Sequence, residues 1–216
     1  MSTARPVDDE VITTALRQLV VGAALVAIAA LVGILVTTFE GPHLDQWWND
    51  AAARLSSLQS FALGMDFVGG GWFASFVVPL GALAVLVLLR RPWAGAFVVA
   101  ASAGSALVVQ ALKGLFGRAR PEEMIVLSDY GSFPSGHTAN AATLAVIAVV
   151  LCARIWVAVV GLAWVMAMAL SRTLVHAHWL TDTIGGALAG CGAALVLAAA
   201  FAVVLSRERE RMPHPA

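Results

Sequence analysis

The stretch Ser171–Asp182, SRTLVHAHWLTD, places an arginine, two histidines and an aspartate between two long apolar runs. An ionisable side chain inside a membrane costs about 2.5–3.5 kcal/mol even on lenient insertion scales, so such a cluster indicates a functional site. His178 and Asp182 stand at spacing i, i+4 and would share a helix face, where the carboxylate can accept a hydrogen bond from the imidazole and fix its tautomer. Arg172 adds a planar, permanently charged group suited to a phosphate or a carboxylate.

The composition around this stretch is that of an integral membrane protein. Of the 216 residues, 60% are hydrophobic and 12% are charged, whereas about 25% are charged in an ordinary soluble domain. No linker separates the apolar runs into two groups, so residues 1–216 are predicted to form one membrane-embedded domain. The formal net charge of zero gives no support for nucleic acid as a partner.

Apolar runs long enough to cross a bilayer predict an all-α bundle of six transmembrane helices. A hydrocarbon core about 30 Å thick requires about 20 residues of helix. The run Thr138–Leu170 is too long for one crossing, so Arg154 within it predicts a tight turn between two short spans. Pro79 predicts a kink in the second span. The predicted spans are residues 19–39, 72–89 and 93–112, two within 138–170, and 183–205.

The segments outside these spans are predicted to be short. Residues 1–18 form a cytoplasmic leader and residues 207–216 a cytoplasmic tail. In the first outer loop, apolar residues between 44 and 58 recur at helical spacing opposite a polar face and include Trp47 and Trp48. This pattern predicts an interfacial helix anchored by tryptophans. The Gly69-Gly70-Gly71 run lacks a following Lys or Ser/Thr, which indicates a flexible turn and not a phosphate loop.

The distribution of charged residues predicts the orientation in the membrane. Short cytoplasmic loops carry an excess of basic residues. The arginines assigned to the cytoplasmic side are Arg5, Arg17, Arg90, Arg91, Arg154, Arg207, Arg209 and Arg211, and the acidic residues assigned to the other side are Glu40, Asp45, Asp50 and Asp66. We therefore expect a multi-pass protein of the cell membrane with both termini in the cytoplasm and the reactive side chains on the extracytoplasmic face.

Two further polar segments fall on the predicted outer side. Lys113, the only lysine, begins the stretch KGLFGRARP, which contains Arg120; taken alone, Lys113 could be an interfacial residue that extends its amine to the membrane surface. Pro134–His137, PSGH, precedes a long apolar helix. Helix capping could explain its proline and serine, but the same geometry presents a hydroxyl, backbone N–H groups and the positive end of the helix dipole to an anion.

A divalent metal is the main alternative ligand for His137, His178 and Asp182, whose types resemble a two-histidine, one-carboxylate set. Three cations on the same side of the membrane argue against a metal, because each would oppose it by several kcal/mol at an effective dielectric constant of about 20. These cations are Lys113, Arg120 and Arg172. The same charges suit a phosphate dianion and the transition state of phosphoryl transfer. We therefore expect no metal and no cofactor.

These segments together resemble the type 2 phosphatidic acid phosphatase superfamily of lipid phosphate phosphatases, whose signature is KxxxxxxRP, PSGH and SRxxxxxHxxxD. All three motifs are complete and in order here, at Lys113–Pro121, Pro134–His137 and Ser171–Asp182. No motif position departs from the pattern. Chance agreement at all three spacings is very improbable, although each motif alone would be weak.

The resemblance implies a role for each motif residue. It implies that His178 is the nucleophile that forms a phosphohistidine, that Asp182 orients it, and that His137 protonates the leaving oxygen and then activates water. It implies a cradle for the phosphoryl oxygens made of Lys113, Arg120, Ser135, Gly136 and Arg172. His176 and Arg118 are additional to the motifs, and we interpret them as residues that tune the environment or lie at the surface. With both histidines titrating, a bell-shaped pH profile is expected near the ordinary histidine pKa of about 6.5.

The expected substrate is a lipid phosphate that enters from the bilayer, and the apolar patch Met124–Leu127 suits its chain. Our first choice is a polyprenyl diphosphate or a phosphatidate-type lipid, and phosphatidylglycerophosphate and a soluble phosphate remain alternatives. A non-catalytic transporter or lipid-binding scaffold is the alternative from another class, although it has no evident need for Asp182 behind His178.

Overall fold

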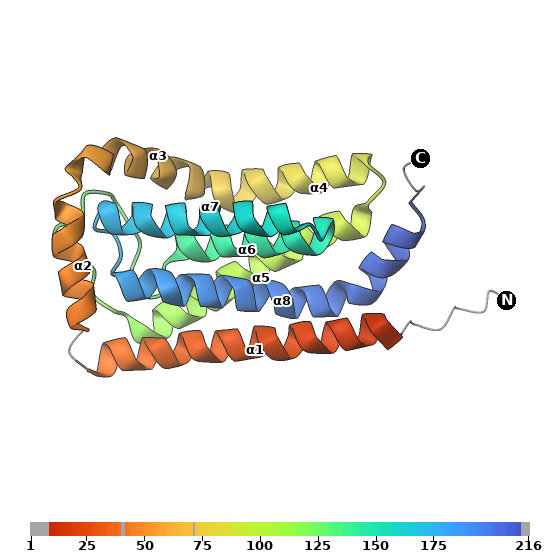
Figure 1. Ribbon diagram of the computed structural model, residues 1–216, viewed down its shortest axis with the longest axis horizontal. Helices are drawn as coiled ribbons and strands as arrows, with labels where there is room; N and C mark the ends of the chain where they lie inside the picture. The colour runs from red at the N-terminus through yellow and green to blue at the C-terminus, as the bar shows by residue number, and fades with distance from the viewer. Residues whose placement is uncertain (1–8, 40–41, 71, 213–216) are drawn as a thin grey trace.

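The computed structural model describes residues 9–39, 42–70 and 72–212, and in these residues it contains helices and no strands (Figure 1). The expected all-α membrane fold is thus confirmed. Its elements are α1 (Asp9–Thr38), α2 (His43–Ala53), the 3-10 turn η1 (Ser56–Leu58), α3 (Gln59–Gly69), the π-helical turn η2 (Phe73–Val77), α4 (Val78–Leu88), α5 (Pro92–Phe116), α6 (Gly136–Cys152), α7 (Ile155–Leu174) and α8 (Leu180–Glu210). Arg5, Glu40, Gly71 and the outer parts of the predicted leader and tail lie outside the described residues.

The number of membrane-spanning helices is four or five by length and composition in the described part of the chain. The helices α1, α5, α7 and α8 are long and apolar enough to cross a bilayer, and the segment containing α3 joins η2 and α4 as a fifth candidate bent by 43°. The apolar helix α6 has 17 residues and is shorter than a typical span. The predicted count of six is therefore not confirmed.

The breaks between helices differ in how well the sequence predicted them. Ala153 and Arg154 alone connect α6 to α7, which confirms the tight turn predicted at Arg154. The second span differs from the prediction, which placed a kink at Pro79. The 43° bend lies between α3 and η2, near the glycine run, and Pro79 lies in the first turn of α4. The π-helical turn η2 ends at Val77, two residues before Pro79. Both a π-helical turn and a proline, which cannot donate the regular backbone hydrogen bond, are known causes of helix bending.

Small residues let α1 and α8 pack closely along the bundle. A Cβ atom on Gly22 in α1 would lie 2.7 Å from the carbonyl oxygen of Gly192 in α8, and the reverse distance is also 2.7 Å. Helices in membranes associate largely through such close backbone contact, since lipid supplies no hydrophobic drive between them. The pair therefore fixes the long helix α8, whose first turn contains the motif residue Asp182.

The helix α2 confirms the predicted helix in the first loop, although it ends at Ala53. Figure 1 shows it lying across one end of the bundle, while both termini of the described chain lie at the opposite end. Its Trp47 is 62% exposed, as an interfacial anchor would be, but Asp45 and Asn49 on the polar face are buried. Part of the polar face of α2 thus packs against the protein, while Gln46 and Asp50 stay exposed.

Candidate active site

The three motifs meet at the end of the bundle that α2 covers. Successive helices run in opposite directions, so the end of α5, the start of α6, the end of α7 and the start of α8 lie at the same end. The motif side chains follow this order: Lys113 is in the last turn of α5, Ser135 caps α6, Arg172 is in the last turn of α7, and Asp182 is in the first turn of α8. His178 lies between α7 and α8.

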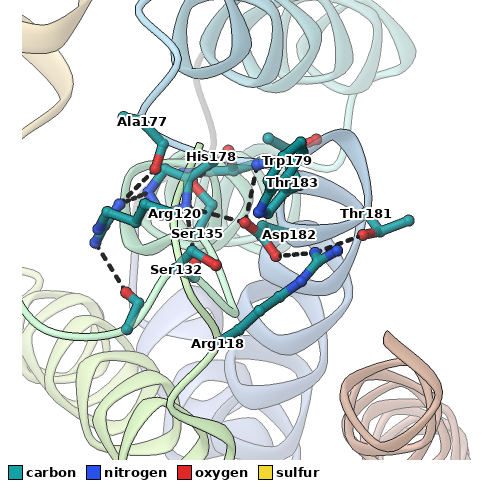
Figure 2. A network of polar contacts seen from close by, with 12 residues as sticks. Arg118, Arg120, Ser132, Ser135, Ala177, His178, Trp179, Thr181, Asp182 and Thr183 are labelled. Atoms are coloured by element: carbon teal, nitrogen blue, oxygen red, sulfur yellow. Dashed lines mark hydrogen bonds and ion pairs between the residues drawn. The ribbon is translucent and has the colours of Figure 1, made fainter. Parts of the chain in front are cut away.

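The imidazole of His178 has one ring nitrogen bound and one directed at a cation (Figure 2). Its Nδ1 lies 2.7 Å from the carbonyl oxygen of Ser132, which can only accept, so Nδ1 carries the hydrogen. Its Nε2 lies 3.3 Å from Nη1 of Arg120, a donor, and so presents its lone pair. Asp182 was predicted to fix this tautomer, but its Oδ2 is 3.6 Å from Nδ1, beyond hydrogen-bond distance. The Ser132 carbonyl performs that task.

His178 is buried, which affects its charge. Burial lowers the pKa of His178 from 6.5 to about 4, and the opposing effect of Asp182 is too small to restore it. The ring is therefore neutral at neutral pH. An acidic limb of activity set by the protonation of His178 would accordingly lie well below the pH of about 6.5 that the sequence predicted.

The protonation state of His178 can be measured by nitrogen NMR on histidine-labelled protein, with the spectrum of His178→Gln used to assign the signal. We expect a neutral ring with hydrogen on Nδ1 at pH 7, and protonation only as the pH falls toward about 4. A doubly protonated ring at pH 6, or hydrogen on Nε2, would contradict the geometry described above.

Asp182 is fully buried, and its carboxylate accepts hydrogen bonds from two groups. Its Oδ1 accepts from Nη1 of Arg118 at 2.6 Å, and its Oδ2 accepts from the backbone N–H of Trp179 at 2.9 Å. Arg118 also donates to Oδ2 of Asp45 in α2 at 2.7 Å. Arg118 is thus a buried link between α2 and the motif aspartate, which agrees with a tuning role and excludes a surface one. No residue spacing predicts this contact between Arg118 and Asp45.

Lys113 and Arg120 converge on the loop between α5 and α6. Nζ of Lys113 lies 3.0 Å from Oδ1 of Asp129 and 2.8 Å from the carbonyl oxygen of Gly131, and Nη2 of Arg120 lies 2.9 Å and 2.8 Å from the same two atoms. Burial acts to raise the pKa of Asp129, but the hydrogen bond and charge of Lys113 outweigh it and lower the pKa. The two cations therefore have an acidic partner that the sequence did not reveal.

Arg172 lies in the last turn of α7, at the same end of the bundle, and is 1% exposed. Its Nη1 donates to Asp66 of α3, while its buried Nε has no hydrogen-bond partner among the described residues. A buried donor without a protein partner is costly to the fold. A guanidinium with a free Nε can donate to an anion such as a phosphoryl oxygen.

Ser135 and Gly136 begin α6. Oγ of Ser135 accepts from the backbone N–H and the hydroxyl of Thr138, and its own N–H donates to the carbonyl oxygen of Asp182 at 3.0 Å. The capping role considered for Ser135 is therefore present in the structure. The first N–H groups of α6, beginning at Gly136, have no acceptor within the helix and are suited to an anion.

His137 packs against the glycine run that ends α3. A Cβ atom on Gly70 would collide with Nε2 of His137, whereas one on Gly64 of α3 would meet nothing within 4 Å. We expect Gly70→Ala to lower activity by about tenfold or more, because a shift of about 1 Å in a catalytic group can cost on the order of 100-fold. Gly64→Ala is the matched control. Phosphate release equal in the two variants would show that this contact does not place His137.

The fold and site define a class: a membrane-embedded helical protein whose buried, neutral histidine faces a group of cations. Residues 93–206, which contain all three motifs, match the PAP2 superfamily, and the chain belongs to this superfamily. No curated protein sequence is significantly similar to the chain.

Two solved structures share the fold. One is a transmembrane PAP2 type phosphatidylglycerolphosphate phosphatase from Bacillus subtilis, with 21% identity and a TM-score of 0.70 over 90% of this chain and 98% of that one. The other is Aquifex aeolicus LpxE, with 21% identity and a TM-score of 0.55 over 76% of this chain and 91% of that one.

Proposed function

We propose that the protein is a lipid phosphate phosphatase that acts through a phosphohistidine on His178, without a metal. The observation that carries this proposal is the imidazole of His178: it is buried and neutral, its Nδ1 is bound to a carbonyl, and its Nε2 faces Arg120. A neutral ring whose lone pair faces a guanidinium is suited to attack a phosphorus atom whose oxygens that cation holds.

The proposed reaction has two transfers. Nε2 of His178 attacks phosphorus, the bond from phosphorus to the lipid oxygen breaks, and His137 gives that oxygen a proton. Water then attacks the phosphohistidine, His137 takes a proton from the water, and inorganic phosphate leaves with His178 restored. While phosphorylated, the ring is cationic, and the carboxylate of Asp182 at 3.6 Å stabilises this charge.

The phosphoryl oxygens would be held by groups from four elements. The side chains of three cations come from α5, the loop after it and α7, and the start of α6 provides backbone N–H groups. This cradle consists of Lys113, Arg120, Arg172, Ser135 and Gly136. A phosphate would replace Asp129 as the partner of Lys113 and Arg120. It would also accept a hydrogen bond from Nε of Arg172.

A lipid substrate is supported by the loop before α6. Ile125 and Leu127 are exposed, while Met124 and Val126 pack against the buried cluster near the end of α7. The predicted apolar patch is thus divided, with two side chains left to contact an acyl or polyprenyl chain. We propose a terminal phosphate on a phosphatidate-type lipid or a polyprenyl diphosphate; a phosphatidylglycerophosphate is the further candidate, since the Bacillus subtilis protein of similar fold is a phosphatase of that class by its name.

The proposed orientation places this site outside the cytoplasm and both termini inside. Arg90, Arg91 and Arg154 lie in turns at the end of the bundle that holds both termini, which agrees with the excess of basic residues in cytoplasmic loops.

The experiment that tests the proposal measures phosphate release by purified full-length protein in excess chelator. The substrates are phosphatidate, lysophosphatidate, phosphatidylglycerophosphate and a polyprenyl diphosphate. We expect release from at least one lipid, unchanged by chelator. Binding without release would favour the transporter or scaffold, and activity lost with chelator would favour a metal-dependent enzyme.

A further inference from the structure

A carboxylate from outside the three motifs lies between Arg172 and His137. Oδ1 of Asp66 in α3 accepts from Nη1 of Arg172 and lies 3.3 Å from Nε2 of His137. The Asp66 side chain is 31% exposed, and that of Arg172 is 1% exposed. A single carboxylate oxygen therefore fixes a buried guanidinium and a half-buried imidazole relative to each other.

The contact determines which nitrogen of His137 is free. Its Nε2 faces α3, where Asp66 accepts from it and where Gly70 leaves room for the ring. Its Nδ1 has no hydrogen bond to any residue in the described ranges. With Nε2–H donated to Asp66, Nδ1 is left to exchange a proton with the substrate or with water. His178 has the complementary arrangement, in which Nδ1 is bound to the Ser132 carbonyl and Nε2 faces Nη1 of Arg120.

The charged groups around His137 come from four elements. Asp66 of α3 contacts it directly, and Arg172 of α7 is bound to the same carboxylate. At the same end of the bundle, Lys113 of α5 is bound to Asp129 and Asp182 of α8 is bound to Arg118. Within the described chain, Asp66 is therefore the carboxylate placed to balance a charge on the His137 ring.

We propose that Asp66 is the positioning residue of His137, the group that holds its Nε2–H and stabilises the imidazolium formed when Nδ1 takes a proton from water. This inference rests on the proposed function. A carboxylate that orients a histidine and stabilises its cation is a general device of acid–base catalysis, and its loss lowers turnover much more than substrate binding. Asp66 acts through His137 and does not itself touch the reacting atoms.

The test compares Asp66→Asn with Asp50→Asn, which changes an exposed aspartate of α2 bound to Gln46. On whichever lipid phosphate the wild-type protein hydrolyses, we expect Asp66→Asn to lower kcat by about tenfold or more. The KM should change by less than about threefold. Asp50→Asn should match the wild type. Asp66→Ser carries the same expectation and is used if the asparagine variant does not fold.

A double variant shows whether the effect passes through His137. If it does, Asp66→Asn should lower the residual rate of His137→Ala by no more than about twofold, since additive losses are expected only of independent groups. Full additivity would overturn the proposal and place the effect on Arg172. A fall in KM with kcat unchanged would also overturn it, because Asp66 would then compete with substrate phosphate. An inactive wild type would instead contradict the proposed function, before any variant is compared.

Discussion

His178→Ala is expected to abolish phosphate release, with a loss of at least about 1,000-fold, because the variant lacks the proposed nucleophile that forms the phosphoenzyme. The neutral ring of His178 points its Nε2 at Arg120 of the proposed cradle. The measurement is the initial rate on a lipid phosphate with purified, folded protein. His43→Ala, a change of an exposed histidine in α2, is the control and should keep wild-type activity. Retention of even a tenth of the wild-type rate by His178→Ala would end the assignment.

His137→Ala is expected to lower kcat/KM on a lipid monoester by about 100-fold to 10,000-fold, the usual range for general acid catalysis. The loss should be smaller on a diphosphate, whose departing phosphate needs little protonation. Measuring kcat/KM isolates the step in which the phosphoryl group moves to His178. Equal losses on the two substrates would argue that His137 does not protonate the leaving group.

The motif residues could be predicted to meet because their spacing relative to the apolar runs determines where they lie. Once α5 to α8 alternate in direction, Lys113, His137, Arg172 and His178 must gather at one end of the bundle. The turn at Arg154 followed from the same reasoning, since a charge interrupts an apolar run that is too long for one crossing. Helix lengths were less predictable: α1 begins at Asp9, well before its apolar run.

The groups that pair with the motif residues could not be predicted. Asp45, Asp66 and Asp129 lie in loop or short-helix segments without a distinctive spacing, and each finds its partner through tertiary contact. The carbonyl of Ser132 fixes the tautomer of His178, and a backbone group leaves no trace in residue type. The burial of Asp45 and Asn49 on the polar face of α2 could not be predicted, because amphipathic spacing shows that two faces of a helix differ and not which one the protein covers.

The central claim is that His178 carries the phosphoryl group between the lipid and water. Its most direct test is to mix the purified protein with a radiolabelled lipid phosphate, quench within the first turnover, and map the label by mass spectrometry. We predict a phosphoryl group on the ring of residue 178 that survives alkali and is lost in acid. Turnover without any such adduct, or with the label on another residue, would contradict the account.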